Sequence, residues 1–183
     1  MSAKKHILLG VTASIAAYKA CEIVRALQQH DIDVAVVMTP EAKEFVSALT
    51  FASLSRNRVY DEMFARDPGA WDIEHVSLAE RADLLLVAPA TANIIGKMAH
   101  GLADDLLSCV AMATKAPVVI APAMNEGMYN NKIVQENIKK LQACGIHVVA
   151  PTKGLLACGA TGEGHLADVE TIVKKVCVLL KIK

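Results

Sequence analysis

The stretch Lys5-His-Ile-Leu-Leu-Gly-Val-Thr-Ala-Ser14 contains the pattern that decides the fold. Its apolar run breaks at Gly10 into small residues, and a helical pattern follows directly and continues to Gln29. This order predicts a buried strand, a tight turn and a helix. The backbone N–H groups at such a helix start favour a phosphate, to which Thr12 or Ser14 can add a hydroxyl. Serine and threonine also cap ordinary helices, and the GxGxxG and Walker A patterns are both missing, so both interpretations stay open.

Apolar runs and helical patterns continue to alternate along the chain. Further strands are predicted over 33–38, 83–88, 117–121 and 146–150, and helices over 40–46, 50–55, 91–99, 104–113, 131–143 and 168–180. Gly145 stands where a glycine ends a helix. Strands that alternate with helices form parallel units. We therefore expect one α/β domain over residues 1–183, a doubly wound Rossmann- or flavodoxin-like parallel sheet with helices on both faces. The polar segment 57–72 and the glycine-rich segment 151–166 are predicted as loops, the second of them a mobile flap.

The composition argues against several classes of function. The chain has 183 residues with 19 Lys+Arg and 19 Asp+Glu, so it has no basic footprint for nucleic acid or an anionic membrane. It is 54% hydrophobic but only 4% aromatic, and this aliphatic excess suits a sheet buried on both faces and a subunit interface. No apolar stretch is long enough to span a bilayer. The five cysteines are widely spaced without a CxxC pair, which argues against disulfides and a zinc site and favours a cytoplasmic enzyme.

Unusual residues follow four of the predicted strands, where doubly wound sheets bind their ligands. Besides the Gly10 turn, these segments are Met38-Thr39-Pro40, Pro89-Ala90-Thr91-Ala92-Asn93 and Pro122-Ala123-Met124-Asn125. Asn125 both donates and accepts hydrogen bonds, so it can bind a carboxylate or an amide without adding charge. Met124 and Met128 can supply adaptable apolar walls beside it. A loop in which Asn125 only caps the next helix is the alternative, and the residues alone leave the two open.

Two further residues are suited to proton transfer. His75 follows a polar loop, and histidine exchanges protons near neutral pH, although a lone histidine is more often a surface or capping residue. The remaining histidines are interpreted as structural: His6, His30, His100, His147 and His165. Cys158 lies in the glycine-rich stretch Gly154–Gly164, whereas the other cysteines lie in apolar helical surroundings. Cys158 is therefore the cysteine available for proton or nucleophile chemistry, unless the stretch is an ordinary loop.

Together these strings resemble the homo-oligomeric flavin-containing cysteine decarboxylase family over essentially the whole chain. The family's Pro-Ala-Ser-Ala-Asn-Thr motif corresponds to Pro89-Ala90-Thr91-Ala92-Asn93-Ile94. Its Pro-X-Met-Asn-X-X-Met-Trp motif corresponds to Pro122–Tyr129. The family's active-site histidine falls on His75, and its substrate-loop cysteine on Cys158. Thr91 keeps the hydroxyl of the family's serine and Tyr129 keeps an aromatic ring, whereas Ile94 loses a hydroxyl.

The resemblance implies a carboxy-lyase that uses FMN. The implied substrate is 4′-phosphopantothenoyl-L-cysteine, whose cysteinyl side chain is oxidised to a thioaldehyde and then loses carbon dioxide. The resulting enethiolate is reduced and protonated to 4′-phosphopantetheine, a precursor of coenzyme A. By resemblance, His75 is the acid/base of the oxidative half, Asn125 binds the departing carboxylate, and Cys158 protonates the enethiolate.

The resemblance also implies which residues contact the ligands and how copies of the chain assemble. FMN contacts are implied for Gly10, Thr12, Ser14, Thr39, Pro89, Ala90, Thr91 and Asn93, and substrate contacts for Asn125, Met128, Ala157, Cys158 and Gly159. A homotrimer is expected, in which neighbouring copies share each FMN site. Assembly of trimers into a homododecamer stays open.

Three alternatives remain beside this interpretation. A decarboxylase acting on the C-terminal cysteine of a peptide shares the histidine and asparagine motifs, but the Ala157-Cys158-Gly159 string disfavours it. A flavin prenyltransferase is disfavoured because that group should lack the Pro-X-Met-Asn string. A non-catalytic flavin-binding regulator is expected to carry an acidic tail, and this sequence ends at Ile182-Lys183 without an acidic run.

Overall fold

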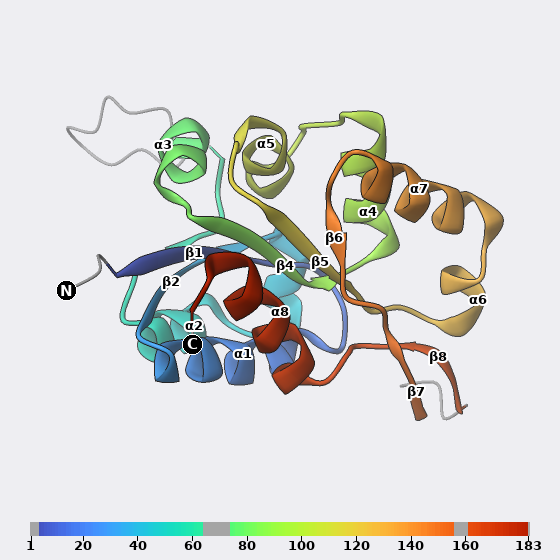
Figure 1. The fold of residues 1–183 in the computed structure, drawn as a ribbon, viewed down its shortest axis with the longest axis horizontal. Helices are drawn as coiled ribbons and strands as arrows, with labels where there is room; N and C mark the ends of the chain where they lie inside the picture. The colour runs from blue at the N-terminus through green and yellow to red at the C-terminus, as the bar shows by residue number, and fades with distance from the viewer. Residues whose placement is uncertain (1–3, 64–73, 156–160, 183) are drawn as a thin grey trace.

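The computed structural model describes residues 4–63, 74–155 and 161–182. In this part of the chain six strands form a parallel sheet in the order β3-β2-β1-β4-β5-β6. They are β1 (Lys5–Val11), β2 (Ile32–Met38), β3 (Val59–Tyr60), β4 (Leu84–Ala90), β5 (Val118–Pro122) and β6 (His147–Val148). Helices cover both faces of the sheet (Figure 1). The predicted doubly wound α/β architecture is confirmed.

The two faces of the sheet are covered by separate groups of helices, each with its own hydrophobic cluster. One face carries α1 (Ala17–Gln29), α2 (Ala48–Ser55) and α8 (Val169–Leu180). The other carries α3 (Glu74–Arg81), α4 (Ala92–His100), α5 (Leu106–Ala113) and α7 (Lys132–Ala143). All residues of β4 are buried, and Leu84 and Leu86 face the first cluster while Leu85 and Val87 face the second. Burial on both faces is the reason that this strand is an uninterrupted apolar run.

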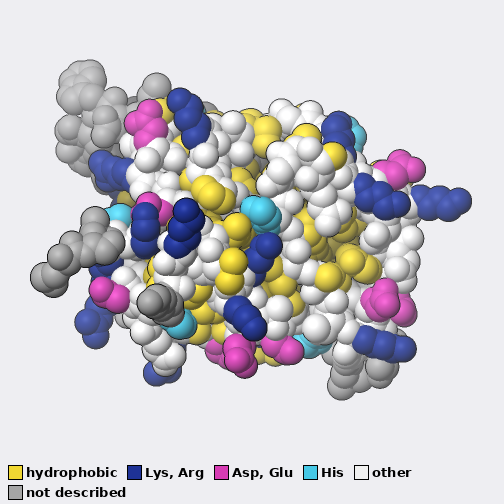
Figure 2. Space-filling view, viewed as in Figure 1, with side chains coloured by type: hydrophobic (Ala, Val, Ile, Leu, Met, Phe, Trp, Pro, Cys, Tyr) yellow, Lys and Arg dark blue, Asp and Glu magenta, His cyan; other side chains and the backbone are white. Residues whose placement is uncertain are grey.

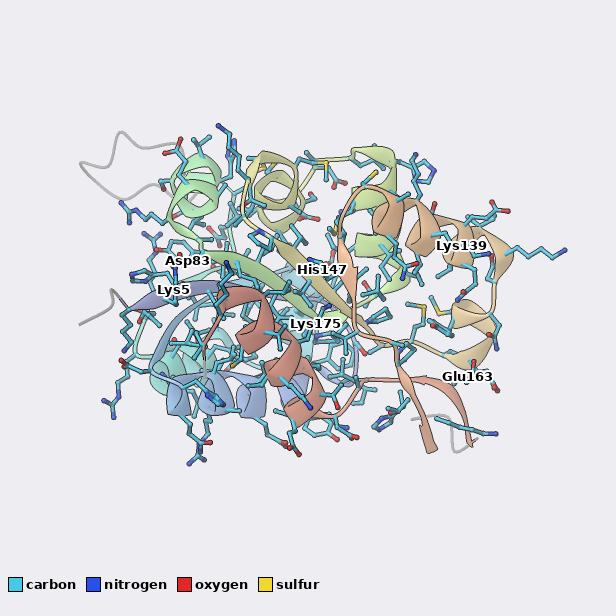
Figure 3. All side chains as sticks on the ribbon, viewed as in Figure 1. Lys5, Asp83, Lys139, His147, Glu163 and Lys175 are labelled. Atoms are coloured by element: carbon cyan, nitrogen blue, oxygen red, sulfur yellow. The ribbon has the colours of Figure 1, made fainter. Side chains whose placement is uncertain are left out.

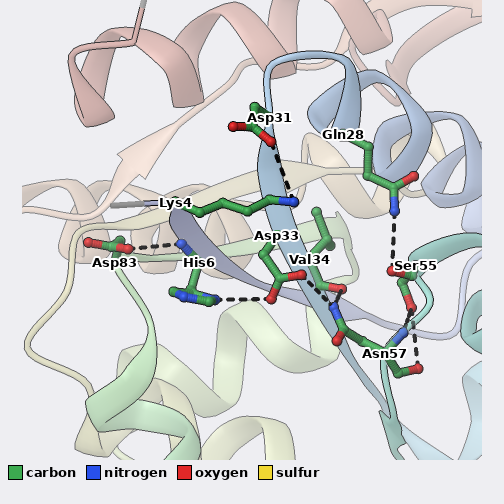
Figure 4. A network of polar contacts seen from close by, with 9 residues as sticks. All are labelled: Lys4, His6, Gln28, Asp31, Asp33, Val34, Ser55, Asn57 and Asp83. Carbon is green, nitrogen blue, oxygen red and sulfur yellow. Dashed lines mark hydrogen bonds and ion pairs between the residues drawn. The ribbon is translucent and has the colours of Figure 1, made fainter. Parts of the chain in front are cut away.

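A polar network joins the strands at the amino end of the sheet (Figure 4). The backbone N–H of His6 donates to Asp83 Oδ2 at 2.8 Å, and His6 Nδ1 lies 3.0 Å from Asp33 Oδ2. Asn57 Nδ2 donates to Asp33 Oδ1 and to the Val34 carbonyl, both at 2.9 Å. Burial alone would raise the pKa of the Asp33 carboxyl, but the hydrogen bonds from Asn57 and His6 outweigh it and lower the pKa. These residues hold the sheet together at the edge opposite the strand ends that carry the candidate site residues.

Two segments predicted as loops contain short strands. β3 lies within 57–72 and pairs with β2. Because β3 is only two residues long, the sequence shows no strand periodicity there. Within 151–166, β7 (Thr152–Leu155) and β8 (Thr161–His165) pair antiparallel. Glycines in both strands remove the alternation of side chains that would have revealed them. The prediction of a patternless loop over 151–166 is therefore wrong for its described part.

Smaller differences concern element type and length. The segment predicted as a helix over 40–46 is a 3-10 helix, η1 (Pro40–Glu44), and the strand predicted over 146–150 is reduced to β6. A one-turn helix, α6 (Glu126–Tyr129), follows β5. The predicted end of α7 is confirmed, since Gly145 has a φ of +88° directly after the C-cap residue Cys144.

The surface agrees with the zero net charge of the sequence. On the face shown in Figure 2, basic, acidic and hydrophobic side chains are interspersed. In the described ranges, no helix has both the length and the apolar composition that crossing a bilayer requires.

Candidate functional site

A cavity of about 980 Å³ opens at the carboxyl ends of the central strands. β1 and β4 are neighbours there, and the chain leaves β1 toward β2 on one side and β4 toward β5 on the other. Ligands of doubly wound sheets bind at such a switch point, and small-molecule sites measure about 300–1,000 Å³. The walls are formed by residues 12–16, 91–94 and 123–125, with further side chains from Thr39, Met128 and His165. Three of the four strand ends singled out in the sequence thus contribute continuous segments, and the fourth contributes Thr39.

Thr12 joins the ends of β1 and β4 at the base of this cavity. Its hydroxyl donates to the Pro89 carbonyl at 2.8 Å and accepts from the Thr91 backbone N–H at 3.1 Å. The side chain is 1% exposed. Because its hydrogen is already donated to Pro89, Thr12 supports the wall and is unsuited to donate to a phosphate. The contact of Thr12 with FMN stays a prediction, and these two bonds favour a supporting role for its hydroxyl.

Gly10, Pro89 and Ala90 lie behind the wall of the cavity and do not line it. A Cβ on Gly10 would stand 2.5 Å from Leu107 Cδ1, so the glycine is needed for the close approach of α5 to the sheet. The Ala90 carbonyl accepts from the Ala123 N–H at 3.0 Å and so joins the ends of β4 and β5. These residues shape the cavity through the backbone.

One end of the cavity has unused hydrogen-bonding capacity. α1 begins after Ala16, and no side chain caps it. The Ser14 hydroxyl accepts from the Ala16 N–H at 3.3 Å, which leaves the hydroxyl hydrogen for a ligand. Thr39 Oγ1 is buried in the wall, and it is the one buried side-chain polar atom of the described residues that has no hydrogen-bond partner. A buried hydroxyl without a partner is costly unless a ligand satisfies it, so this end fits the phosphate and hydroxyl groups of a nucleotide-like cofactor.

Asn125 lies at the opposite wall as the N-cap of α6. Its Oδ1 accepts from the Gly127 N–H at 2.8 Å, so Asn125 does cap the next helix, and it lines the cavity as well. The same bond orients the amide and determines which atom is the acceptor. Met128, on the same helix, lines the cavity with its side chain 49% exposed. An oriented amide and an apolar side chain on one turn suit a small acidic ligand with an apolar arm.

The charged groups of the cavity were not singled out by the sequence patterns. Lys19 is the one lysine or arginine among the described lining residues, and its Nζ lies 3.4 Å from His165 Nε2. His165 Nδ1 lies 2.9 Å from the Leu166 carbonyl, which can only accept, so Nδ1 bears the hydrogen and Nε2 accepts from Lys19. The sequence predicts only a structural role for His165, but the residue lines the cavity. The two residues are 146 positions apart, and only the return of β8 past α1 brings them together.

Asp105 is a half-buried acid at the edge of the cavity. Burial alone would raise the pKa of its carboxyl. Hydrogen bonds from Lys97 Nζ at 2.6 Å and from the Ser108 N–H at 2.8 Å outweigh burial and lower that pKa below its usual value. The carboxylate also caps α5, so it is an ionised structural group at the working pH.

The structure does not bring His75 into this cavity. His75 lies half-buried in the first turn of α3, and in Figure 1 α3 and α6 lie at opposite ends of the molecule. Cys158 and its neighbours Ala157 and Gly159 lie outside the described residues. Burial raises the pKa of the Cys21, Cys109 and Cys177 thiols, as expected for cysteines with a packing role.

The chain belongs to the Flavoprotein family, whose model matches residues 1–181. It is 47% identical over 170 residues to the coenzyme A biosynthesis bifunctional protein CoaBC of Bacillus subtilis. This match covers 93% of the chain and 42% of the relative, so the chain spans about two fifths of the length of such bifunctional relatives. It is also 44% identical over 174 residues to a probable phosphopantothenoylcysteine decarboxylase of Streptococcus mutans, covering 94% of the chain and 97% of that relative.

Solved structures share the fold across nearly the whole chain. A PPC decarboxylase mutant complexed with pantothenoylaminoethenethiol superposes with a TM-score of 0.88 at 31% identity, covering 97% of this chain and 99% of the other. The FMN binding protein AtHal3 superposes with a TM-score of 0.84 at 31% identity, covering 97% of each chain. The peptidyl-cysteine decarboxylase EpiD gives 0.79 at 28% identity, covering 94% of this chain and 98% of the other. The resemblance drawn from the sequence motifs is confirmed at the level of the family.

Proposed function

We propose that residues 1–183 form a flavoprotein domain that decarboxylates 4′-phosphopantothenoyl-L-cysteine to 4′-phosphopantetheine in coenzyme A biosynthesis, in the cytoplasm. The observation that carries the proposal is the cavity at the switch point. There the unpartnered Thr39 hydroxyl and the uncapped start of α1 lie across from the Asn125 amide. Sequence relatives named for this reaction and structural neighbours named for FMN support it.

FMN fits the end of the cavity formed by Ser14, Thr39, Thr91 and Asn93, all of which line it. When bound, FMN supplies an acceptor and donor of hydride. The Ser14 hydroxyl and the start of α1 would hold its phosphate, and Thr39 would gain its missing partner. Gly10, Pro89 and Ala90 would act on FMN only indirectly, by shaping the backbone.

Asn125 would bind the carboxylate that leaves as carbon dioxide. A neutral amide orients this group without the strong ground-state attraction of a cation, which would oppose dispersal of the charge in the transition state. Cys158 would protonate the enethiolate, with Ala157 and Gly159 beside the substrate. Met128 would contact the apolar arm.

His75 would reach the substrate from a neighbouring copy of the chain. A shared site in a homotrimer explains how a histidine on α3 can serve a cavity beside α6, at the other end of the same chain. Size-exclusion chromatography with light scattering measures the assembly. Mixing the inactive variants His75→Asn and Asn125→Asp tests sharing: exchange of subunits should restore activity, and no restoration would refute it.

Lys19 would make the site prefer 4′-phosphopantothenoylcysteine over a peptide substrate. It gives the cavity a cationic end, next to His165, that suits the phosphomonoester of the proposed substrate. Lys19→Gln should raise KM for 4′-phosphopantothenoylcysteine while the dissociation constant for FMN stays unchanged. A parallel loss of FMN would instead assign Lys19 to the cofactor phosphate.

The direct test is turnover by the purified protein. A yellow protein with a flavin absorption band should release carbon dioxide from 4′-phosphopantothenoylcysteine, with 4′-phosphopantetheine identified by mass spectrometry. Asn125→Asp is the matched control, because aspartate also caps helices while its charge repels the carboxylate. A flavin-loaded wild-type protein that releases no carbon dioxide would refute the enzymatic proposal and leave a flavin-binding regulator.

A further inference from the structure

The hairpin of β7 and β8 is attached to the Asn125 segment through its backbone. The Met124 N–H donates to the Gly164 carbonyl at 3.0 Å. The Glu163 N–H donates to the Glu126 carboxylate, Oε1, at 3.3 Å. Figure 3 labels Glu163 on β8, below α6 in this view. The glycine-rich stretch that suggests mobility in the sequence is therefore bonded to the cavity wall along β8.

The glycines of β8 make this close approach possible. A Cβ on Gly162 would stand 2.5 Å from Glu126 Oε2 and 2.6 Å from Glu126 Cδ, so the carboxylate occupies the space that a side chain would fill. Gly164 has a φ of +118°, and a Cβ there would overlap the Met124 carbonyl oxygen. Gly164 requires glycine because the Met124 backbone packs directly on it, whereas a side chain at Gly162 would push the Glu126 carboxylate aside.

Glu126, which accepts the hydrogen bond from β8, directly follows Asn125, the proposed carboxylate-binding residue. Asn125 caps α6, and Glu126, half-buried, is the first residue of the same one-turn helix. A rotation of this short helix moves both side chains together. The Glu126 carboxylate accepts a hydrogen bond from the β8 backbone and also fills the space beside Gly162, so this one side chain makes two contacts with β8.

We propose that Glu126 is a positioning residue that sets strand β8 against the Asn125 amide. Glu126 does not line the cavity, and it acts by holding two walls of the cavity in one alignment. The inference rests on the proposed function. Misplacing a reacting group by about 1 Å can lower a rate by about 100-fold, so loss of the contact should reduce kcat more than substrate binding.

The test compares substitutions on the two sides of the contact. Glu126→Ala should lower kcat about tenfold with a much smaller change in KM and an unchanged dissociation constant for FMN. Glu126→Gln keeps the accepting oxygen and should restore most of kcat. Gly162→Ala should reproduce the loss, because its methyl group displaces the carboxylate. Glu136→Ala, which removes an exposed glutamate of α7, is the matched control and should leave kcat unchanged.

The double variant Glu126→Ala/Gly162→Ala separates positioning from general damage. If the two changes break one contact, the double variant should be no slower than either single variant. Losses of kcat that multiply, or a Glu126→Ala protein with wild-type kcat, would overturn the inference. If Glu126→Ala does not fold, the other two single variants decide. Wild-type kcat in Gly162→Ala would overturn the inference. A loss of kcat in Glu126→Gln as large as that in Gly162→Ala would also overturn it. A wild-type protein without decarboxylase activity would refute the proposed function instead.

Discussion

Two threonines at neighbouring strand ends allow a test of how the cavity is built. Thr12 and Thr39 are both buried, at 1% and 6% exposure, and both line the cavity. The Thr12 hydroxyl is bonded to the Pro89 carbonyl and the Thr91 N–H, whereas the Thr39 hydroxyl has no partner. Replacing each threonine with valine removes the hydroxyl at nearly constant shape. The same substitution should therefore destabilise the FMN-free protein at Thr12 but not at Thr39.

The expected magnitudes follow from the bonds that are lost. Thr12→Val leaves the buried Pro89 carbonyl unpaired at a cost of about 1–3 kcal/mol, while the half-buried Thr91 N–H at the cavity wall can bond to water, so we expect a loss of about 1–3 kcal/mol in the free energy of unfolding. Thr39→Val removes a hydroxyl that was already unpaired, so the FMN-free protein should be equally stable or up to about 1 kcal/mol more stable. Thr39→Val should also weaken FMN binding about 2- to 10-fold, the equivalent of one hydrogen bond of about 0.5–1.5 kcal/mol.

Urea unfolding of the FMN-free proteins, at one protein concentration, measures the first effect. Fluorescence titration with FMN measures the second. Thr12→Ser and Thr39→Ser keep the hydroxyl and are the controls. Equal losses of stability in the two valine variants, or wild-type FMN affinity in Thr39→Val, would refute the assignment of Thr12 to the scaffold and Thr39 to the cofactor.

Other consequences can be measured on single variants. Gly10→Ala should reduce the free energy of unfolding by about 1–3 kcal/mol through its clash with Leu107, while the FMN affinity of the folded protein is unchanged. If the variant has wild-type stability but binds FMN more weakly, Gly10 contacts the cofactor. Gly164→Ala should lower the melting temperature, because φ there is +118° and the Met124 carbonyl fills the space, whereas Gly127→Ala, with an ordinary backbone, should be milder; equal shifts would contradict the docking of β8. The lowered pKa of Asp105 means that its stabilising effect is complete above the usual aspartate value of about 3.9 and is lost as the pH falls through its lower folded-state value. The wild-type melting temperature should therefore fall more steeply than that of Asp105→Asn below about pH 4, and parallel curves would show that the Lys97 and Ser108 bonds contribute nothing.

Periodicity revealed the long elements because burial on both faces of the sheet leaves a strong local pattern. β1, β2 and β4 are apolar runs that end at Gly, Thr-Pro or Pro, and the amphipathic helices α1, α7 and α8 repeat at helical spacing. β3 and β6 are two residues long, and β7 and β8 contain glycines, so no local pattern marks them. The motif resemblance selected the segments around Asn93 and Asn125 that line the cavity.

The sequence by itself determined the α/β class, the main strands and the segments that meet at their carboxyl ends, since these depend on local periodicity and turn chemistry. Only the tertiary structure decided what each side chain does there. Thr12 and Thr39 look equivalent as residues, yet one is satisfied by the protein and the other is not, because their partners come from distant strands. Lys19 contacts His165, and the Glu126 carboxylate packs against Gly162. No local sequence pattern encodes either contact.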